Sequence, residues 1–88
     1  MPQSDLFLEA INFVKTAPAT SAAIQQRDAD PNLILLQVVC RAYTYTGQMG
    51  FQLEIIFDYQ IHNNTHPGQP DLVYHVLPLS HGGFAFIP

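Results

Sequence analysis

The stretch that decides the fold is FQLEIIFDYQIH, residues 51–62. Its odd positions are all apolar or aromatic, and its even positions are polar except for Ile56. Successive side chains of a β-strand point to opposite faces, so a period of two is typical of a strand at the surface of a core. The pattern predicts one buried face and one solvent-facing face, and it assigns each residue to one of them.

A partner for this strand precedes it in the chain. Residues 33–46, LILLQVVCRAYTYT, carry mainly β-branched and aromatic side chains in their second half, which favours a strand. Residues 47–50 contain two glycines and suit a short hairpin connection. A slip by one residue would set apolar residues against polar ones, so we expect a register in which apolar residues face each other. The predicted pairs are Thr46–Phe51, Thr44–Leu53, Ala42–Ile55, Cys40–Phe57, Val38–Tyr59 and Leu36–Ile61.

Two helices are expected before the hairpin. Residues 4–17 have apolar side chains at three- and four-residue spacing, Ser4 or Asp5 can cap the helix, and Pro18 ends it. A weaker helix is predicted from Thr20 or Ser21, both good capping residues, to Ala29.

Two more strands are expected after the hairpin. Residues 62–70 are rich in proline and asparagine and predict a loop, whereas residues 71–77 predict a third strand that ends before Pro78. Residues 80–83 predict a turn and residues 84–87 a short edge strand. Helices grouped before strands indicate an α+β domain over residues 1–88, with one or two N-terminal helices packed on a three- to four-stranded antiparallel sheet.

Composition limits the function. The 88 residues are 48% hydrophobic but only 11% charged, against about 25% in typical proteins. A surface with so few charges is either simply neutral or partly covered by another chain, and we favour the second interpretation because interface cores are depleted in charge. The net charge of −4 slightly favours a basic partner. Only Lys15, Arg27 and Arg41 are basic, which is too few cations for nucleic-acid binding.

The cellular setting is expected to be the cytoplasm. Cys40 is the single cysteine, so no intrachain disulfide is possible, and we expect its thiol to be a small core residue in a reducing compartment. No apolar run is long enough to cross a membrane and no signal peptide is visible, so we expect no membrane partner.

The solvent-facing side of the hairpin is the candidate binding surface. Tyrosine and arginine with few other charges are the composition of binding hot spots, although tyrosines also serve simply as cross-strand pairs that cover a sheet. No helix in the C-terminal half is available to cover this side. The predicted contact residues are Arg41, Tyr43, Tyr45, Glu54 and Ile56. The leading hypothesis is therefore a non-catalytic protein-binding domain that needs no cofactor, as a small accessory, inhibitory or regulatory subunit or a homo-oligomer.

The alternative is a small ligand-binding or metal-assisted hydrolytic domain. All four histidines lie in the C-terminal third of the chain, and a set of histidines with a carboxylate can hold a divalent metal. Dense metal-binding spacings are absent, so the signal is weak. The candidate ligands are Asp58, His62, His66 and His75.

Overall fold

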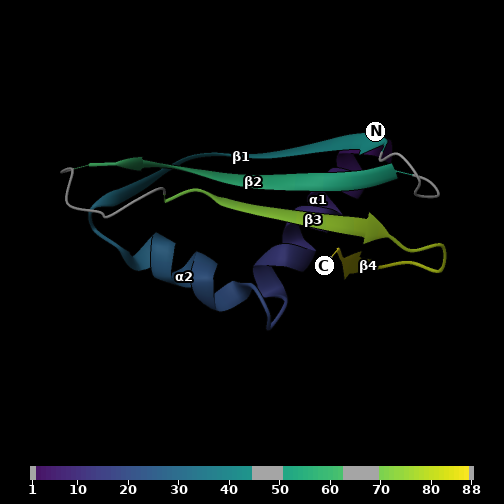
Figure 1. The fold of residues 1–88 in the computed structure, drawn as a ribbon, viewed down its shortest axis with the longest axis horizontal. Coiled ribbons are helices and arrows are strands. Elements are labelled where there is room, and N and C mark those ends of the chain that lie inside the picture. Colours follow the sequence, from purple (N-terminus) through teal and green to yellow (C-terminus); the bar gives the residue numbers. More distant parts are fainter. Residues whose placement is uncertain (1, 45–50, 63–69, 88) are drawn as a thin grey trace.

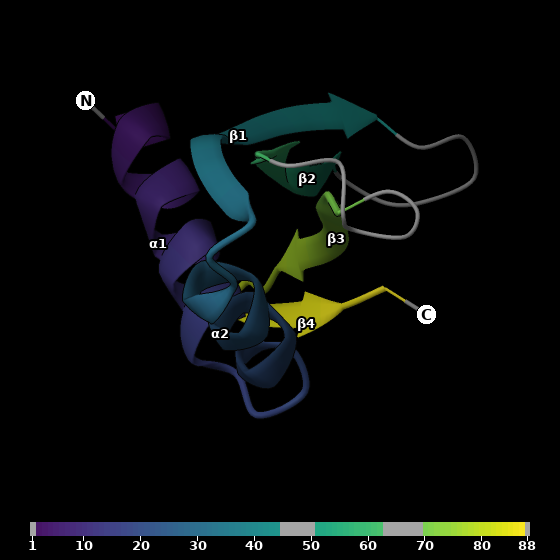
Figure 2. The same cartoon turned by 90° about the vertical axis from the view of Figure 1, so that its left-hand side faces the viewer.

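The protein is described by a computed structural model that covers residues 2–44, 51–62 and 70–87. The elements are α1 (Pro2–Thr16), α2 (Ser21–Ala29), β1 (Leu33–Thr44), β2 (Phe51–Ile61), β3 (Leu72–Pro78) and β4 (Phe84–Phe86). The strands form one antiparallel sheet in the order β1-β2-β3-β4, and both helices lie on the same face of it (Figures 1 and 2). Two helices on a four-stranded antiparallel sheet confirm the predicted α+β fold class.

Helix α1 crosses the strands on one face of the sheet and contacts β1, β2 and β3. It begins at Pro2, slightly before the predicted start, and ends at Thr16 ahead of Pro18. The predicted apolar stripe faces the strands, since Ala10 and Val14 are completely buried.

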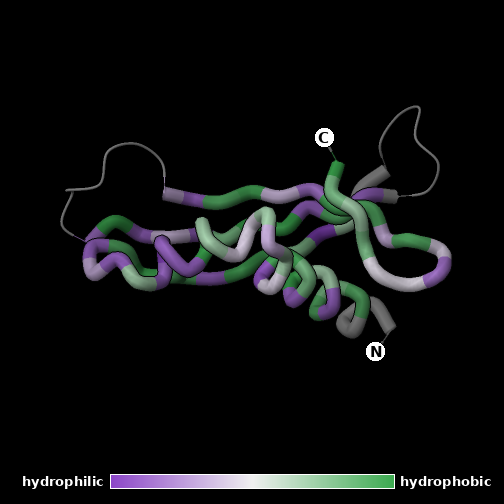
Figure 3. The backbone as a smooth tube through the Cα atoms, turned by 90° about the horizontal axis from the view of Figure 1, so that it is seen from below, coloured by the Kyte–Doolittle hydropathy of each residue, from purple (hydrophilic) through white to green (hydrophobic). Residues whose placement is uncertain are grey.

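Helix α2 is fixed to its neighbours by polar contacts. Thr20 lies at its N-cap position, but the expected side-chain cap is not formed; the buried Thr20 hydroxyl instead donates to the carbonyl of Val14 in α1. At the other end of α2, the Tyr59 hydroxyl of β2 donates to Asp28 over 2.8 Å. Viewed from below in Figure 3, the helices lie in front of the strands, with hydrophilic and hydrophobic residues interspersed along them.

The core lies between the helices and the sheet. Strand β2 contributes the largest share of it, because its odd residues from Leu53 to Tyr59 point toward the helices as predicted. The buried apolar residues are Ala10, Val14, Ile24, Leu33, Leu53, Ile55, Phe57, Tyr59 and Val76.

The predicted hairpin register is wrong by two residues. Thr44, not Thr46, faces Phe51, and Cys40 faces Ile55 rather than Phe57. A shift of two residues leaves every side chain on its face of the sheet, so the alternation of apolar and polar residues fits both registers equally well. Thr46 and the predicted loop at 47–50 lie outside the described residues, as does most of the predicted loop at 62–70.

A second correction concerns the first residues of β1. The register shifts between Leu35 and Gln37, which leaves Leu36 as an extra residue in a β-bulge. Leu33 is buried, whereas Ile34, Leu35 and Leu36 are exposed, although the predicted pair with Ile61 placed Leu36 on the buried face. One extra residue is enough to exchange the two faces of a strand.

The last two strands agree with the sequence within one residue. Strand β3 is central, between β2 and β4, and β4 is a short edge strand as predicted. The turn between them contains Gly82 and Gly83 at φ values of 98° and 82°, a region that favours glycine. The Leu79 amide donates to the Gly83 carbonyl and closes this turn.

Candidate protein-binding surface

The face of the sheet opposite the helices is covered by no helix or strand among the described residues (Figure 2). We call this surface the open face. Strand pairing brings its side chains into rows that run across β1, β2 and β3. Its members with described side chains are Gln37, Val39, Arg41, Gln52, Glu54, Ile56, Asp58, Val73 and His75.

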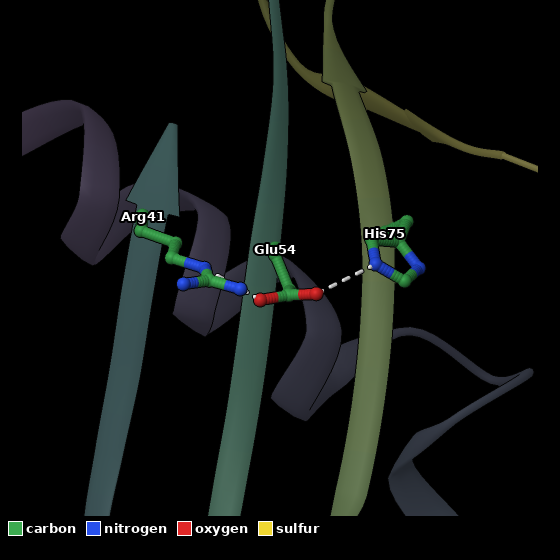
Figure 4. A network of polar contacts seen from close by, with 3 residues as sticks. All are labelled: Arg41, Glu54 and His75. Atoms are coloured by element: carbon green, nitrogen blue, oxygen red, sulfur yellow. Dashed lines mark hydrogen bonds and ion pairs between the residues drawn. The ribbon is translucent and has the colours of Figure 1, made fainter. Parts of the chain in front are cut away.

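A polar row crosses the open face. Glu54 of β2 faces Arg41 of β1 on one side and His75 of β3 on the other. Arg41 Nε donates to Glu54 Oε1 over 2.7 Å, and His75 Nε2 lies 3.1 Å from Glu54 Oε2 (Figure 4). Both carboxylate oxygens are thus engaged by neighbours that the sheet holds in position.

The electrostatics of this row favour an ionised carboxylate. The hydrogen bond from His75, and the hydrogen bond and positive charge of Arg41, lower the pKa of Glu54, and they outweigh the opposing effect of burial. The side chain of Glu54 is only 16% exposed, whereas that of Arg41 is 68% exposed. Arg41 therefore presents its guanidinium outward while one of its donors is already satisfied.

An apolar row lies directly beside the polar one. Val39 faces Ile56 across β1 and β2, and Ile56 faces Val73 across β2 and β3. Val73 is 48% exposed, an unusual degree for an aliphatic side chain on a central strand. On the other side of this row, Gln37 Nε2 donates to Asp58 Oδ2 over 3.1 Å. Apolar surface bordered by satisfied polar groups is the arrangement found in protein interfaces.

The structure brings together part of the predicted contact set. Arg41, Glu54 and Ile56 lie on the open face in adjacent rows. Tyr43 takes its place in β1 opposite Gln52, and Tyr45 lies outside the described residues. Gln52 is buried at 3% exposure, so the open face is not accessible along its whole length.

Sequence reasoning did not place Val73 and His75 on the open face, although it expected His75 to make a hydrogen bond or to line an interface. Both belong to β3, whose two faces are largely apolar, so the alternation does not say which of its residues join the hairpin's polar side. The register between β2 and β3 would have assigned these residues to a face. Predicting that register requires the number of residues in the loop between the two strands, and composition does not give this number.

The candidate metal ligands are dispersed. His75 is paired with Glu54, Asp58 is bonded to Gln37, and His62 is exposed just after the end of β2. No group of three potential ligand side chains occurs within the part of the chain that the structure describes. His66 lies outside that part, so the metal-binding alternative stays a prediction.

Comparison of the chain with protein-family models, with curated proteins and with solved structures gave no match. Among the described residues, no helix has the length and apolar character needed to cross a membrane.

Proposed function

We propose that this chain is a non-catalytic protein-binding domain, acting as a small accessory, inhibitory or regulatory subunit, and that the open face is its contact surface. The observation that carries the proposal is the apolar row formed by Val39, Ile56 and Val73 on a sheet face that no described element covers. An exposed apolar strip bordered by polar groups marks an interaction site more often than an ordinary solvated surface.

The polar groups beside the apolar row support the same function. Burying a charge without a partner is costly, but Glu54 is already bonded on both oxygens within its own chain. A partner can therefore cover this region without leaving the carboxylate unpaired. Arg41, whose side chain is mostly exposed, adds the kind of residue that is enriched in binding hot spots.

The remaining expectations belong to the same proposal. The partner is a protein, with a slight preference for a basic one because the chain carries a net charge of −4. Two of its three cations are engaged by Glu54 and by the Pro70 carbonyl, which supports the exclusion of nucleic acid. The single free thiol is consistent with function in the cytoplasm.

The test is a substitution in the apolar row. Val73→Lys adds a charge to the exposed end of the row, and Gln25→Lys adds the same charge to an exposed position of α2 on the opposite side of the molecule. We expect the immobilised wild-type chain and Q25K to retain the same protein partner from host extract, and V73K to lose at least about 90% of it, as for a charge buried in an interface core.

Two controls complete the experiment. Circular dichroism and thermal unfolding establish that V73K is as folded as Q25K. Equal capture by V73K would contradict the assignment of the open face, and the absence of any retained protein would contradict the protein-binding function itself.

A further inference from the structure

Strand β1 is an edge strand, and it is much longer than the opposite edge. It runs from Leu33 to Thr44, whereas β4 contains only Phe84–Phe86. The β-bulge at Leu36 interrupts β1 near its start, so the regular part of this edge is residues 37–44. No described strand or helix pairs with it on its outer side.

The direction of the backbone groups along this edge follows from the neighbouring strands. The His75 carbonyl accepts a bond from the Ile87 amide on its far side, so the backbone groups of His75 point away from β2. Glu54, directly opposite His75, therefore directs its own backbone groups toward Arg41 of β1. Since alternate residues point to opposite sides, Cys40 and its neighbours at positions 38 and 42 direct their N–H and C=O groups outward, toward solvent.

The usual protections of an exposed edge are missing from this segment. Lysine and proline commonly prevent edge strands from pairing with other chains, and residues 37–44 contain neither. Its one charge, Arg41, is already paired with Glu54. The outward-pointing backbone thus matches a further β-strand rather than a helix or a small molecule.

On the helix side, apolar surface continues along the same edge. A shallow groove of about 410 Å³ separates α1 from β1, and its lining residues are Phe7, Leu8, Ile11, Val38 and Cys40. Leu8 is 58% exposed at its rim. A strand added beside β1 would extend the floor of this groove and remove its apolar lining from water.

We propose that a second copy of this chain pairs with β1 in antiparallel orientation, so that the two sheets join into one. The inference goes beyond the proposed function, because it uses the edge of the sheet and leaves the open face available. A second copy fits because the edge offers a symmetric register in which its one cation, Arg41, comes near a carboxylate of the other copy.

Every antiparallel register that is symmetric about one residue keeps side chains on matching faces, and we compare the three centred on Arg41, Cys40 and Val39. Placing Arg41 opposite the partner's Arg41 sets like charges against each other, and placing Cys40 opposite the partner's Cys40 leaves the two arginines as diagonal neighbours. The third register places Val39 on the two-fold axis and Arg41 opposite the partner's Gln37. That Gln37 is bonded to Asp58, so Arg41 lies between its own Glu54 and the partner's Asp58.

This register makes a sharp prediction for cross-linking. Val39 directs its backbone groups toward β2, so on the axis it forms a non-hydrogen-bonded pair, whose Cα atoms lie about 4.5 Å apart. That separation falls within the range of a disulfide. In a background in which Cys40 is replaced by serine, Val39→Cys should form an intermolecular disulfide at least about tenfold faster than Val73→Cys, which reports chance encounters of an exposed cysteine on the same face.

The solution mass provides the second test. We expect light scattering to show a concentration-dependent dimer that Val39→Lys weakens at least about tenfold, since it brings two ammonium groups together on the axis. Val73→Lys adds the same charge to the same apolar row, away from the edge, and should leave the dimer unchanged.

The outcomes are distinct from those of the open-face proposal. A wild-type chain that stays monomeric over the whole concentration range, or equal cross-linking rates for the two cysteine variants, would overturn the edge pairing. Loss of a captured partner by V73K concerns the open face alone. If V39K unfolds, the cross-linking rates of the two cysteine variants still test whether β1 pairs with a second copy.

Discussion

At the scale of single residues, two buried or half-buried polar contacts shift the pKa of the side chain that they hold. One is the phenol of Tyr59 against Asp28, and the other is the carboxylate of Glu54 between Arg41 and His75. Their pKa values shift in opposite directions, because burial and a nearby carboxylate keep a phenol neutral, whereas donors keep a carboxylate charged.

Tyr59→Phe removes one hydrogen bond and keeps the ring in the core. We expect the free energy of unfolding to fall by about 1 kcal/mol, the typical net value of such a bond. Burial, and then the bond to Asp28, raise the pKa of Tyr59, so the stabilisation is complete below the unfolded value of 10.0 and is lost as the pH rises further. Urea denaturation between pH 7 and pH 11 measures both effects.

A double-mutant cycle with Asp28→Ala isolates this contact. The coupling energy between the two substitutions should account for most of the loss in Y59F. If Y59F and wild type lost stability equally above pH 10, the link between the phenol and alkaline unfolding would be refuted.

Glu54→Gln tests the polar row. The pKa of Glu54 is lowered in the folded state, so its carboxylate stabilises the fold above the ordinary value of 4.5, and this contribution disappears as the pH falls below that value. We expect E54Q to be less stable than wild type by about 1 kcal/mol at pH 7, since one partner is exposed, and to approach wild type near pH 3. A difference that is independent of pH would argue that shape, not charge, holds the row together.

At the scale of the elements, β4 is held by α1 as well as by the sheet. Its strand is short, and Phe13 of α1 contacts both of its aromatic rings, with centroid distances of 5.5 Å to Phe84 and 5.0 Å to Phe86. Aromatic pairs at such distances stabilise more than their buried area alone. The edge strand is therefore held from its face by a helix that lies far away in the sequence.

Phe13→Ala should loosen β4 selectively. We expect a loss of about 2–4 kcal/mol, somewhat below the cost at a fully buried phenylalanine. Hydrogen exchange at the Ile87 amide, which donates to the His75 carbonyl, should accelerate far more than exchange in β2. Phe13→Leu is the matched control and should keep most of this protection, whereas unchanged exchange at Ile87 in F13A would show that β4 is held by the sheet alone.

The elements themselves were predictable, and their pairing was not. Alternation in β2 identified its buried face because each side chain is assigned by local pattern. The register with β1 was wrong because a shift of two residues preserves the pattern, and the bulge at Leu36 was missed because LILL is apolar on either face. Local periodicity contains no information on where an extra residue is accommodated.

At the scale of the whole molecule, the two faces of the sheet differ in whether helices cover them. The helices cover one face, and the other remains uncovered by the described elements (Figure 2). The sequence predicted this asymmetry, since two helical segments precede the strands and none follows. It predicted Arg41, Glu54 and Ile56 as surface residues but not their neighbours on β3, because the β2–β3 pairing depends on loop length.

Pairing of two copies along β1 would extend this difference between the two faces over a dimer. Two copies joined along β1 would place both open faces on the same side of one continuous sheet, with all helices on the other side. A partner would then meet two equivalent apolar rows related by the two-fold axis. Binding through both copies at once would raise the apparent affinity without new contacts in either copy.

The order of the elements also governs how the chain can fold during synthesis. Both helices leave the ribosome before the strands, yet the buried strand residues that cover their apolar sides belong mainly to β2, which follows a long edge strand. At roughly 5–20 residues per second, several seconds pass before Leu53–Tyr59 can close the core. During that interval the exposed sides of α1 and β1 are available to chaperones and to neighbouring nascent chains. Each later strand then adds directly beside the previous one, so the sheet can be completed through short hairpin steps without a long-range search.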